Sequence, residues 1–167
     1  MVHILVAFDT RHGSTADVAR AIAESLRAKG AEVDVELTRD VREFSGVDAL
    51  VVGAPIYSGR WLSGGHRILK RVARLSPERT PPVAIFAFGP RADDGPENWV
   101  HPREQFERAL AKHPSVKPVS TALFGGADPP KKTPRRDIRD WTAIAAWADE
   151  IAPLLGVGST VTEPPRG

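Results

Sequence analysis

Three segments of strand length, residues 2–8, 49–54 and 83–88, are apolar over nearly their whole length. A strand with one wet face alternates apolar and polar residues, so a continuous apolar run must be covered on both faces. Sheets covered on both faces are typically parallel, because the helix that connects two parallel strands packs against the sheet. The sequence therefore predicts an α/β domain with helices on both faces of a parallel sheet.

Segments with a helical period separate these apolar runs. After Ser14, buried-type residues recur every four positions as far as Gly30, which predicts a helix with one apolar stripe. Ser14 and Asp17 are spaced like a capping box, and Gly30 is placed to end the helix. Asp137 or Asp140 is placed to begin the last helix. Further helices are predicted over residues 60–75, 97–112 and 141–155, and further strands over residues 32–37 and 116–124. Gly64 and Gly65 weaken the start of the 60–75 helix, so its first turn can also be a loop.

Strands and helices that alternate at this spacing predict right-handed βαβ units in a doubly wound sheet. One domain is expected over residues 1–155, because a chain of 167 residues is near the common size of a single domain. Residues 156–167 show no apolar period and predict a disordered tail.

Composition excludes several classes of protein. The chain has no cysteine, which excludes thiolate catalysis, disulfides, iron–sulfur clusters and thiol-ligated zinc. Any redox chemistry therefore needs a bound cofactor. A net charge of +2 with intermixed signs gives no support for nucleic-acid binding. The sequence has no apolar run long enough for a membrane span and no leader pattern, so a cytoplasmic protein is expected.

One local excess of positive charge stands out late in the chain. It consists of Lys131, Lys132, Arg135, Arg136 and Arg139. One interpretation is a solvated basic loop, and the other is contact with an anionic partner or, peripherally, with a membrane surface through Lys131 to Arg136.

In an open parallel sheet, ligands bind beyond the carboxyl ends of the strands, so the loops after the first, third and fourth strands are the candidate site. The first loop consists of Thr10, Arg11, His12, Gly13, Ser14 and Thr15. It combines three hydroxyls, a glycine, nearby positive charge and the positive end of a helix dipole, all of which suit a phosphate. The alternative is turn and capping chemistry alone.

The other two loops add aromatic and polar groups at the same edge. The candidate residues after the third strand are Pro55, Ile56, Tyr57, Ser58, Gly59 and Trp61, and those after the fourth are Gly89, Pro90 and Asp93. Tyr57 and Trp61 can sandwich a planar ring, or they can pack on the next helix as the edge of the core. The polar third loop, with Trp99 just beyond it, is placed to rim the same pocket.

These three loops, in this order, resemble the flavodoxin family. The phosphate loop of that family reads Ser/Thr-x-x-Gly-x-Thr, and residues 10–15 fit that spacing. The resemblance implies a flavodoxin-like three-layer sandwich with five parallel strands in the order 2-1-3-4-5. Within the family, the chain is most similar to flavodoxin-domain proteins related to menaquinone-dependent protoporphyrinogen oxidase. Residues 7–15, 53–61 and 140–152 carry that similarity.

The resemblance implies one FMN per chain. The 10–15 loop would hold the phosphate, and Tyr57, Gly59 and Trp61 would contact the isoalloxazine ring. The expected function is an FMN-dependent oxidoreductase or electron-transfer protein whose partner is a redox protein or a small molecule, with quinones and porphyrinogens as candidates. The flavin carries the electrons in such a protein, so no catalytic side chain is assigned.

Two departures from the family leave an alternative open. Electron-carrier flavodoxins are typically acidic, whereas this chain is slightly basic, and the long insertion of the membrane-linked porphyrinogen oxidases is short here. The alternative is a flavodoxin-like domain without flavin that serves as a binding or scaffolding module, with Trp61 and Trp99 filling the ring position. The five histidines have no paired metal-ligand spacing and are expected to be surface or loop groups.

Overall fold

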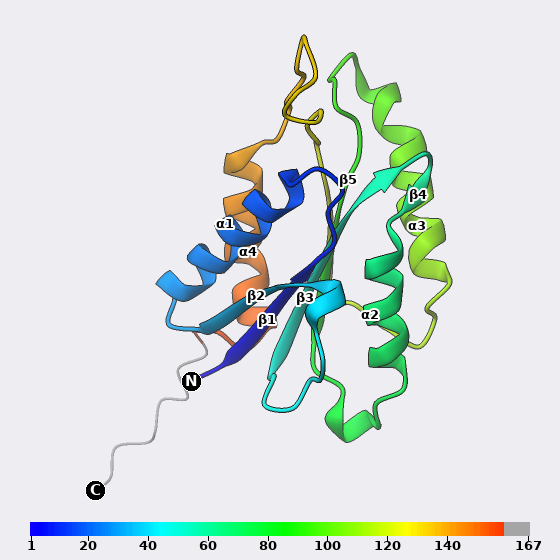
Figure 1. The fold of residues 1–167 in the computed structure, drawn as a ribbon. Coiled ribbons are helices and arrows are strands. Elements are labelled where there is room, and N and C mark those ends of the chain that lie inside the picture. Colours follow the sequence, from blue (N-terminus) through cyan, green and yellow to red (C-terminus); the bar gives the residue numbers. More distant parts are fainter. Residues whose placement is uncertain (159–167) are drawn as a thin grey trace, which may run out of the picture.

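The computed structural model describes residues 1–158, and it contains the predicted parallel sheet with helices on both faces (Figure 1). The long strands are β1 (His3–Phe8), β2 (Glu32–Leu37), β3 (Ala49–Tyr57), β5 (Val83–Phe88) and β6 (Ser120–Phe124). They lie in the order β2-β1-β3-β5-β6, and each neighbouring pair of them is parallel. The predicted fold class and strand order are confirmed.

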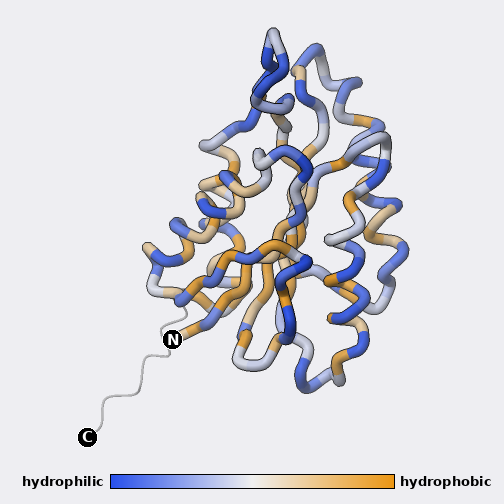
Figure 2. Tube along the Cα trace, in the orientation of Figure 1, coloured by the Kyte–Doolittle hydropathy of each residue, from blue (hydrophilic) through white to orange (hydrophobic). Residues whose placement is uncertain are grey.

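Two hydrophobic cores lie on opposite faces of the sheet. The helices are α1 (Ser14–Ala28), α2 (Ser63–Ala73), α3 (Val100–Ala111) and α4 (Trp141–Leu154). Helices α1 and α4 cover the face to which Ile4 and Val6 point, whereas α2 and α3 cover the face of Leu5 and Ala7. The apolar colour of Figure 2 accordingly concentrates along the strands. Both faces are covered, which is why these strands are apolar throughout.

The segment 60–75, predicted as a helix whose first turn can be a loop, begins as a strand. A short strand, β4 (Arg60–Trp61), pairs antiparallel with the end of β3. The turn between them is Ser58 and Gly59, at φ 50° and 75°. Left-handed backbone at both turn positions defines a type I′ hairpin, whose twist matches that of the flanking strands. Helix α2 therefore starts only at Ser63, after the hairpin.

The predicted capping box at the start of α1 is wrong. Gly13 occupies the cap position at φ 90°, no side chain caps the helix, and Ser14 is already the first helical residue. The Asp17 carboxylate is instead paired with Arg139 at 3.2 Å. Because the cap lacks a side-chain acceptor, the N–H groups at this helix start remain available for another partner.

Other predicted helix ends are confirmed. Gly30, at φ 97°, follows α1, and its N–H donates to the carbonyl of Arg27. The Asp140 side chain accepts from the N–H of Ala143 and caps α4. Three single-turn helices occur in connections: η1 (Thr38–Asp40), η2 (Pro77–Arg79) and η3 (Pro96–Trp99), the last of which takes the first turn of the helix predicted from residue 97.

The core reaches slightly beyond the expected domain end. Val157 is buried against the α1 and α4 core, two residues into the segment that was expected to be a tail. The rest of that predicted tail, residues 159–167, lies outside the described residues. In the part of the chain that the structure describes, no helix is both long enough and apolar enough to span a bilayer.

Candidate functional site

The three candidate loops meet at Tyr57. The carboxyl ends of β1, β3 and β5 lie at the same end of the sheet (Figure 1). The His12 ring lies edge-on to the Tyr57 ring with centroids 5.7 Å apart. The guanidinium groups of Arg11 and Arg91 lie over the same ring, at 5.2 and 4.8 Å from its centroid. Tyr57 on the second loop therefore touches residues of both other loops.

Side-chain hydrogen bonds shape the 10–15 loop. The Thr10 hydroxyl accepts from the N–H of Gly13 at 2.8 Å, and the Asp9 carboxylate accepts from the N–H of Thr10 at 2.9 Å. The first bond closes a tight turn that Gly13 completes with left-handed backbone. The loop is thus held in shape by its own residues.

Several polar groups of this loop have no partner. The backbone N–H groups of residues 11, 12, 14 and 15 donate to no acceptor within residues 1–158. The Thr15 side chain is fully buried, and its hydroxyl likewise lacks a hydrogen-bond partner within the described residues. A buried unpaired hydroxyl costs about 1–3 kcal/mol. The loop is therefore arranged for an acceptor with several oxygens at the positive end of α1.

A link that the sequence did not predict fixes the base of this loop. The second Asp9 oxygen accepts from the N–H of Gly64 in α2 at 2.9 Å. A Cβ at Gly64 would come within 2.5 Å of that oxygen and 2.2 Å of the Thr38 hydroxyl. Only glycine allows α2 to approach so closely, and this contact joins the end of β1 to the start of the helix that follows the hairpin.

Two alternatives were open for Trp61, contact with a planar ring or packing at the edge of the core, and the structure shows the second. Its side chain is buried, and the indole N–H donates to the carbonyl of Ala54 at 3.0 Å. The ring packs against His66 and Phe106, with centroids 5.3 and 6.0 Å away. The reason is the unpredicted hairpin, because β4 turns Trp61 back onto the α2 and α3 core.

The remaining residues of the second loop divide between core and surface. Pro55 is buried in β3 and Ile56 packs against the α2 and α3 core, whereas Ser58 and Gly59 are exposed at the hairpin turn. Tyr57, half-buried between them, is the residue that faces the other loops. Of the residues in this loop that were expected to contact a planar ring, Tyr57 and the turn at Ser58 and Gly59 are the ones at the surface of this edge.

The third loop is anchored to the segment after β6. The N–H of Gly89 donates to the carbonyl of Phe124, and the carbonyl of Pro90 accepts from Gly126, both at 2.8 Å. Asp93 is exposed and accepts from the indole of Trp99 at 3.5 Å. Gly89 and Pro90 are therefore fixed next to the strand ends, whereas Asp93 contacts Trp99 of the following η3 rather than the other two loops.

A buried carboxylate organises the late basic segment. Asp128 is completely buried and accepts from the Arg136 side chain at 2.8 Å, from Lys132 at 3.3 Å and from Arg91 at 3.5 Å. The hydrogen bonds from Arg136 hold the pKa of this carboxyl well below its usual range. Asp137 likewise accepts from Arg135 and Arg139. Much of the predicted surplus of positive charge is thus neutralised within the segment, and Arg91 ties it to Tyr57.

A pair of histidines joins α2 to the end of α3. The Nδ1 of His66 and the Nε2 of His113 are 2.7 Å apart, so one ring donates to the other when both are neutral. Burial, followed by the positive charges nearby, lowers the pKa of His66 to about 4 and also lowers that of His113. The prediction that the histidines are surface or loop groups fails for the side chain of His113, which is buried. No cluster of three or more metal-ligating side chains occurs within residues 1–158.

Acidification is expected to destabilise the protein through this pair. In the unfolded chain His66 gains its proton near pH 6.5, whereas in the folded protein its pKa is about 4. Neutral His66 therefore contributes fully to the free energy of unfolding above pH 6.5, and this contribution is lost as the pH falls to about 4. Because His66 is only half-buried, we expect a loss of about 2 kcal/mol rather than the full effect of the shift. Chemical denaturation at several pH values measures it, with the variant His66→Gln/His113→Gln as control. Parallel pH profiles for the two proteins would contradict the assignment.

Known proteins share both the family and the fold. A family model described as a flavodoxin domain matches residues 5–131. Among curated proteins, no sequence matches this chain significantly.

Several solved flavodoxins superimpose on nearly the whole chain. A short-chain flavodoxin associated with a bacterial microcompartment aligns with a TM-score of 0.65 at 16% identity, over 93% of this chain and 99% of that one. The flavodoxin of Streptococcus pneumonia aligns with a TM-score of 0.62 at 18% identity, over 92% and 99%. A Fusobacterium nucleatum flavodoxin, bound to flavin mononucleotide, aligns with a TM-score of 0.57 at 13% identity, over 93% and 99%. At these identities the likeness concerns the fold.

Proposed function

Since the chain belongs to the flavodoxin domain family, we propose that it binds one FMN and acts as an electron-transfer flavoprotein. One observation carries the proposal: the 10–15 loop offers unpaired N–H donors and the unpaired buried hydroxyl of Thr15, with no acceptor for them among the described residues. A phosphate group supplies acceptor oxygens to several such donors at once and is favoured by the dipole of α1. The flavodoxin of Fusobacterium nucleatum, similar in fold, is bound to FMN.

The residues present fit this cofactor. His12, Gly13, Ser14 and Thr15 would hold the phosphate, and the charge of Arg11 lies next to them. FMN, when bound, supplies the transfer of electrons or hydride, while the protein orients the ring and tunes its potential. No side chain of this chain is assigned as acid or base.

Tyr57 and the hairpin turn would contact the ring. The Tyr57 face is covered by the guanidinium groups of Arg11 and Arg91, so ring stacking there requires one of them to move. Each such contact is worth only about 0.5–1 kcal/mol at an exposed site, which makes the exchange inexpensive. Gly59, at φ 75°, allows the peptide beside the ring to rearrange at low cost. Gly89, Pro90 and Asp93 would rim the ring on the side of the third loop.

Replacing Thr15 with Val is expected to weaken FMN binding by about 1–3 kcal/mol, because the phosphate loses one hydrogen bond. The same change should leave the apoprotein as stable as before or slightly more stable, since it removes an unpaired buried hydroxyl without changing shape. Titration with FMN, followed by flavin fluorescence, gives the affinity, and chemical denaturation gives the stability.

Two controls isolate the phosphate contact. Thr15→Ser keeps the hydroxyl and should keep most of the affinity. Riboflavin lacks the phosphate, so its weaker binding should be the same in the parent and in Thr15→Val. An unchanged FMN affinity in Thr15→Val would remove this hydroxyl from the phosphate site, and failure of FMN to bind at all would favour the flavin-free binding module.

We further propose a substrate class for the flavin. The resemblance of residues 7–15 and 53–61 to the protoporphyrinogen oxidase branch suggests a quinone or a porphyrinogen as substrate. Peripheral contact of Lys131 to Arg136 with an anionic membrane, and a location in the cytoplasm, likewise stay predictions. Two anaerobic experiments test the substrate classes. Addition of menadione to the reduced flavoprotein should restore the oxidised flavin spectrum if a quinone accepts the electrons. Addition of a porphyrinogen to the oxidised flavoprotein should bleach the flavin, with formation of the porphyrin, if a porphyrinogen donates them.

A further inference from the structure

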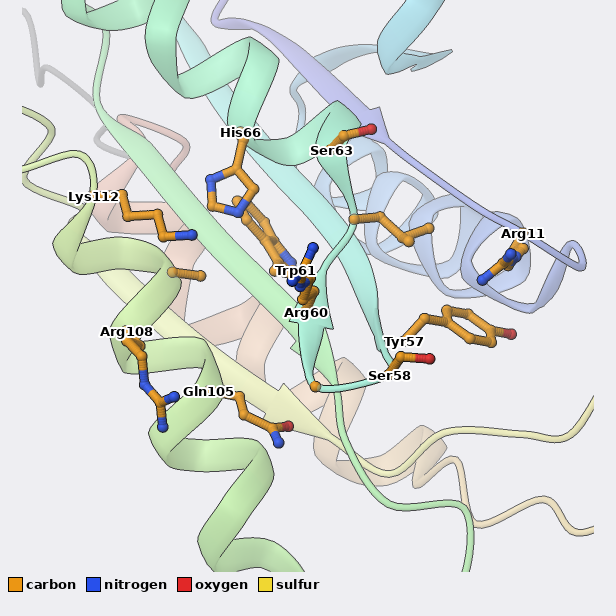
Figure 3. Close-up of a pocket in the computed structure, with 13 residues that line it drawn as sticks. Arg11, Tyr57, Ser58, Arg60, Trp61, Ser63, His66, Gln105, Arg108 and Lys112 are labelled. Carbon is orange, nitrogen blue, oxygen red and sulfur yellow. The ribbon is translucent and has the colours of Figure 1, made fainter.

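A pocket of about 550 Å³ opens beside the β3–β4 hairpin, between α2 and α3 (Figure 3). Its lining includes the cationic side chains of Arg11, Arg60, Arg108 and Lys112, together with His66 and Gln105. Tyr57, Ser58 and Gly59 form its border with the candidate flavin site. Leu62 and Ala109 give it an apolar part. This volume is within the range of small-molecule sites, and the mostly polar and cationic lining suits a charged molecule rather than an apolar one.

The positive charges around this pocket are not neutralised by side chains of residues 1–158. None of the lining residues is acidic, and within residues 1–158 none of the four cationic side chains forms an ion pair. Some cations outside the pocket are paired: Arg136 with Asp128, Arg139 with Asp137, and Lys29 with Asp149. The pocket differs from the rest of the surface in that four cationic side chains line one concave surface without any acidic residue, although the chain has nearly equal numbers of acidic and basic residues.

The charges also act on the neighbouring histidines. The positive charge of Lys112 contributes to the lowered pKa of both His66 and His113. Like charges gathered around a concave surface repel one another, and the low-dielectric walls strengthen their field. An anion in the pocket would relieve that repulsion. Arg60 and Arg108 can bind phosphate or carboxylate oxygens in pairs, because the guanidinium group is a planar fork of donors.

We propose that this pocket binds a small organic molecule that carries two or more phosphate or carboxylate groups. Its position beside the ring rests on the proposed function, because Tyr57 and Gly59 belong both to the pocket border and to the proposed ring contacts. A molecule held there by its anionic groups would have its remaining part next to the flavin edge. That is where an electron donor or acceptor must lie, so the pocket selects an anionic redox partner.

The test uses the FMN-loaded protein, in which the phosphate loop is filled, and two probes: pyrophosphate for phosphate groups and citrate for carboxylates. The side-chain amide of Gln105 and the backbone amide of Gly59, both in the pocket lining, are followed by NMR. We expect saturable shifts at these amides with at least one probe. The variant Arg108→Gln/Lys112→Gln should lower the affinity for that probe by roughly tenfold or more, since charge-assisted hydrogen bonds are lost.

A matched control removes the same charge elsewhere. Arg74 and Lys117 are exposed and do not line the pocket, so Arg74→Gln/Lys117→Gln should change the affinity less than about twofold. Binding by phosphate alone, or by citrate alone, identifies the kind of anionic group. The proposal would be overturned if both double variants lost affinity for the probe to the same extent. It would also be overturned if neither probe shifted the amides of Gln105 and Gly59.

The outcome is separable from that of the proposed function. If FMN does not bind, the proposed function fails, and the same titrations are made on the apoprotein. Shifts at Gln105 that depend on Arg108 and Lys112 would then still support an anion site. Shifts confined to the amides of Gly13 and Thr15 would instead show that the probe binds at the 10–15 loop, and would overturn the proposal of an anion site in the pocket.

Discussion

Replacing Trp61 with Ala is expected to lower the free energy of unfolding by about 3–5 kcal/mol, the usual cost of deleting a buried indole. The ring is 2% exposed and packs against Phe106 and His66, and its N–H is bonded to the carbonyl of Ala54. Truncation leaves a cavity in the α2 and α3 core and removes the hydrogen bond to the Ala54 carbonyl in β3. Chemical denaturation of the apoprotein measures the loss.

Tyr57→Ala is the matched comparison. Tyr57 lies at the surface side of the same hairpin and contributes little to either core, so this change should lower FMN affinity with little loss of stability. Trp61→Ala should show the opposite: a large loss of stability, but little change in FMN affinity when the affinity is measured under conditions in which the variant is fully folded. A stable Trp61→Ala protein with strongly weakened ring binding would restore the ring contact predicted from the sequence.

Gly53→Ala is expected to destabilise the fold by about 3 kcal/mol or more, because the new methyl group has no room. Gly53 lies in β3, between β1 and β5 in the sheet. A Cβ built there would be 1.9 Å from the Cζ of Phe86, a fully buried side chain of β5. Either the ring or the strand must shift, and both lie in the middle of the core. Chemical denaturation and the yield of folded protein measure the effect.

Two further variants assign this effect to the ring. Phe86→Leu shortens the side chain that blocks the space, so Gly53→Ala should cost much less in that background. Gly126→Ala adds the same methyl at another buried glycine, where the nearest atom lies 3.4 Å away, and should be tolerated. A Gly53→Ala penalty that persisted unchanged in Phe86→Leu would point to backbone strain rather than to the contact.

The sheet and its helices could be predicted because their signal is local. A continuous apolar run such as residues 83–88 is buried on both faces whatever lies next to it, and the β5 strand has those bounds. Gly30 and Asp140 likewise act on backbone groups a few residues away. The 10–15 loop was predicted for the same reason, since its hydroxyls, its glycine and the helix that follows are contiguous in the sequence.

What could not be predicted depends on partners far away in the chain. The choice between a ring contact and a core position for Trp61 stayed open, because nothing in the sequence distinguishes a loop from the two-residue hairpin that turns Trp61 inward. The contact between Asp9 and Gly64 spans 55 residues, and that between His66 and His113 spans 47. No spacing along the sequence reveals such pairs.

By itself, the sequence determined the layered α/β architecture, the strand order through its family resemblance, and the loop that is suited to a phosphate. The tertiary structure alone decided which aromatic residue faces that loop, which cations pair with the buried Asp128 and which line a pocket. The physical reason is that secondary structure follows from burial and backbone geometry over a few residues. The charge and shape of a site instead depend on which distant segments the fold brings into contact.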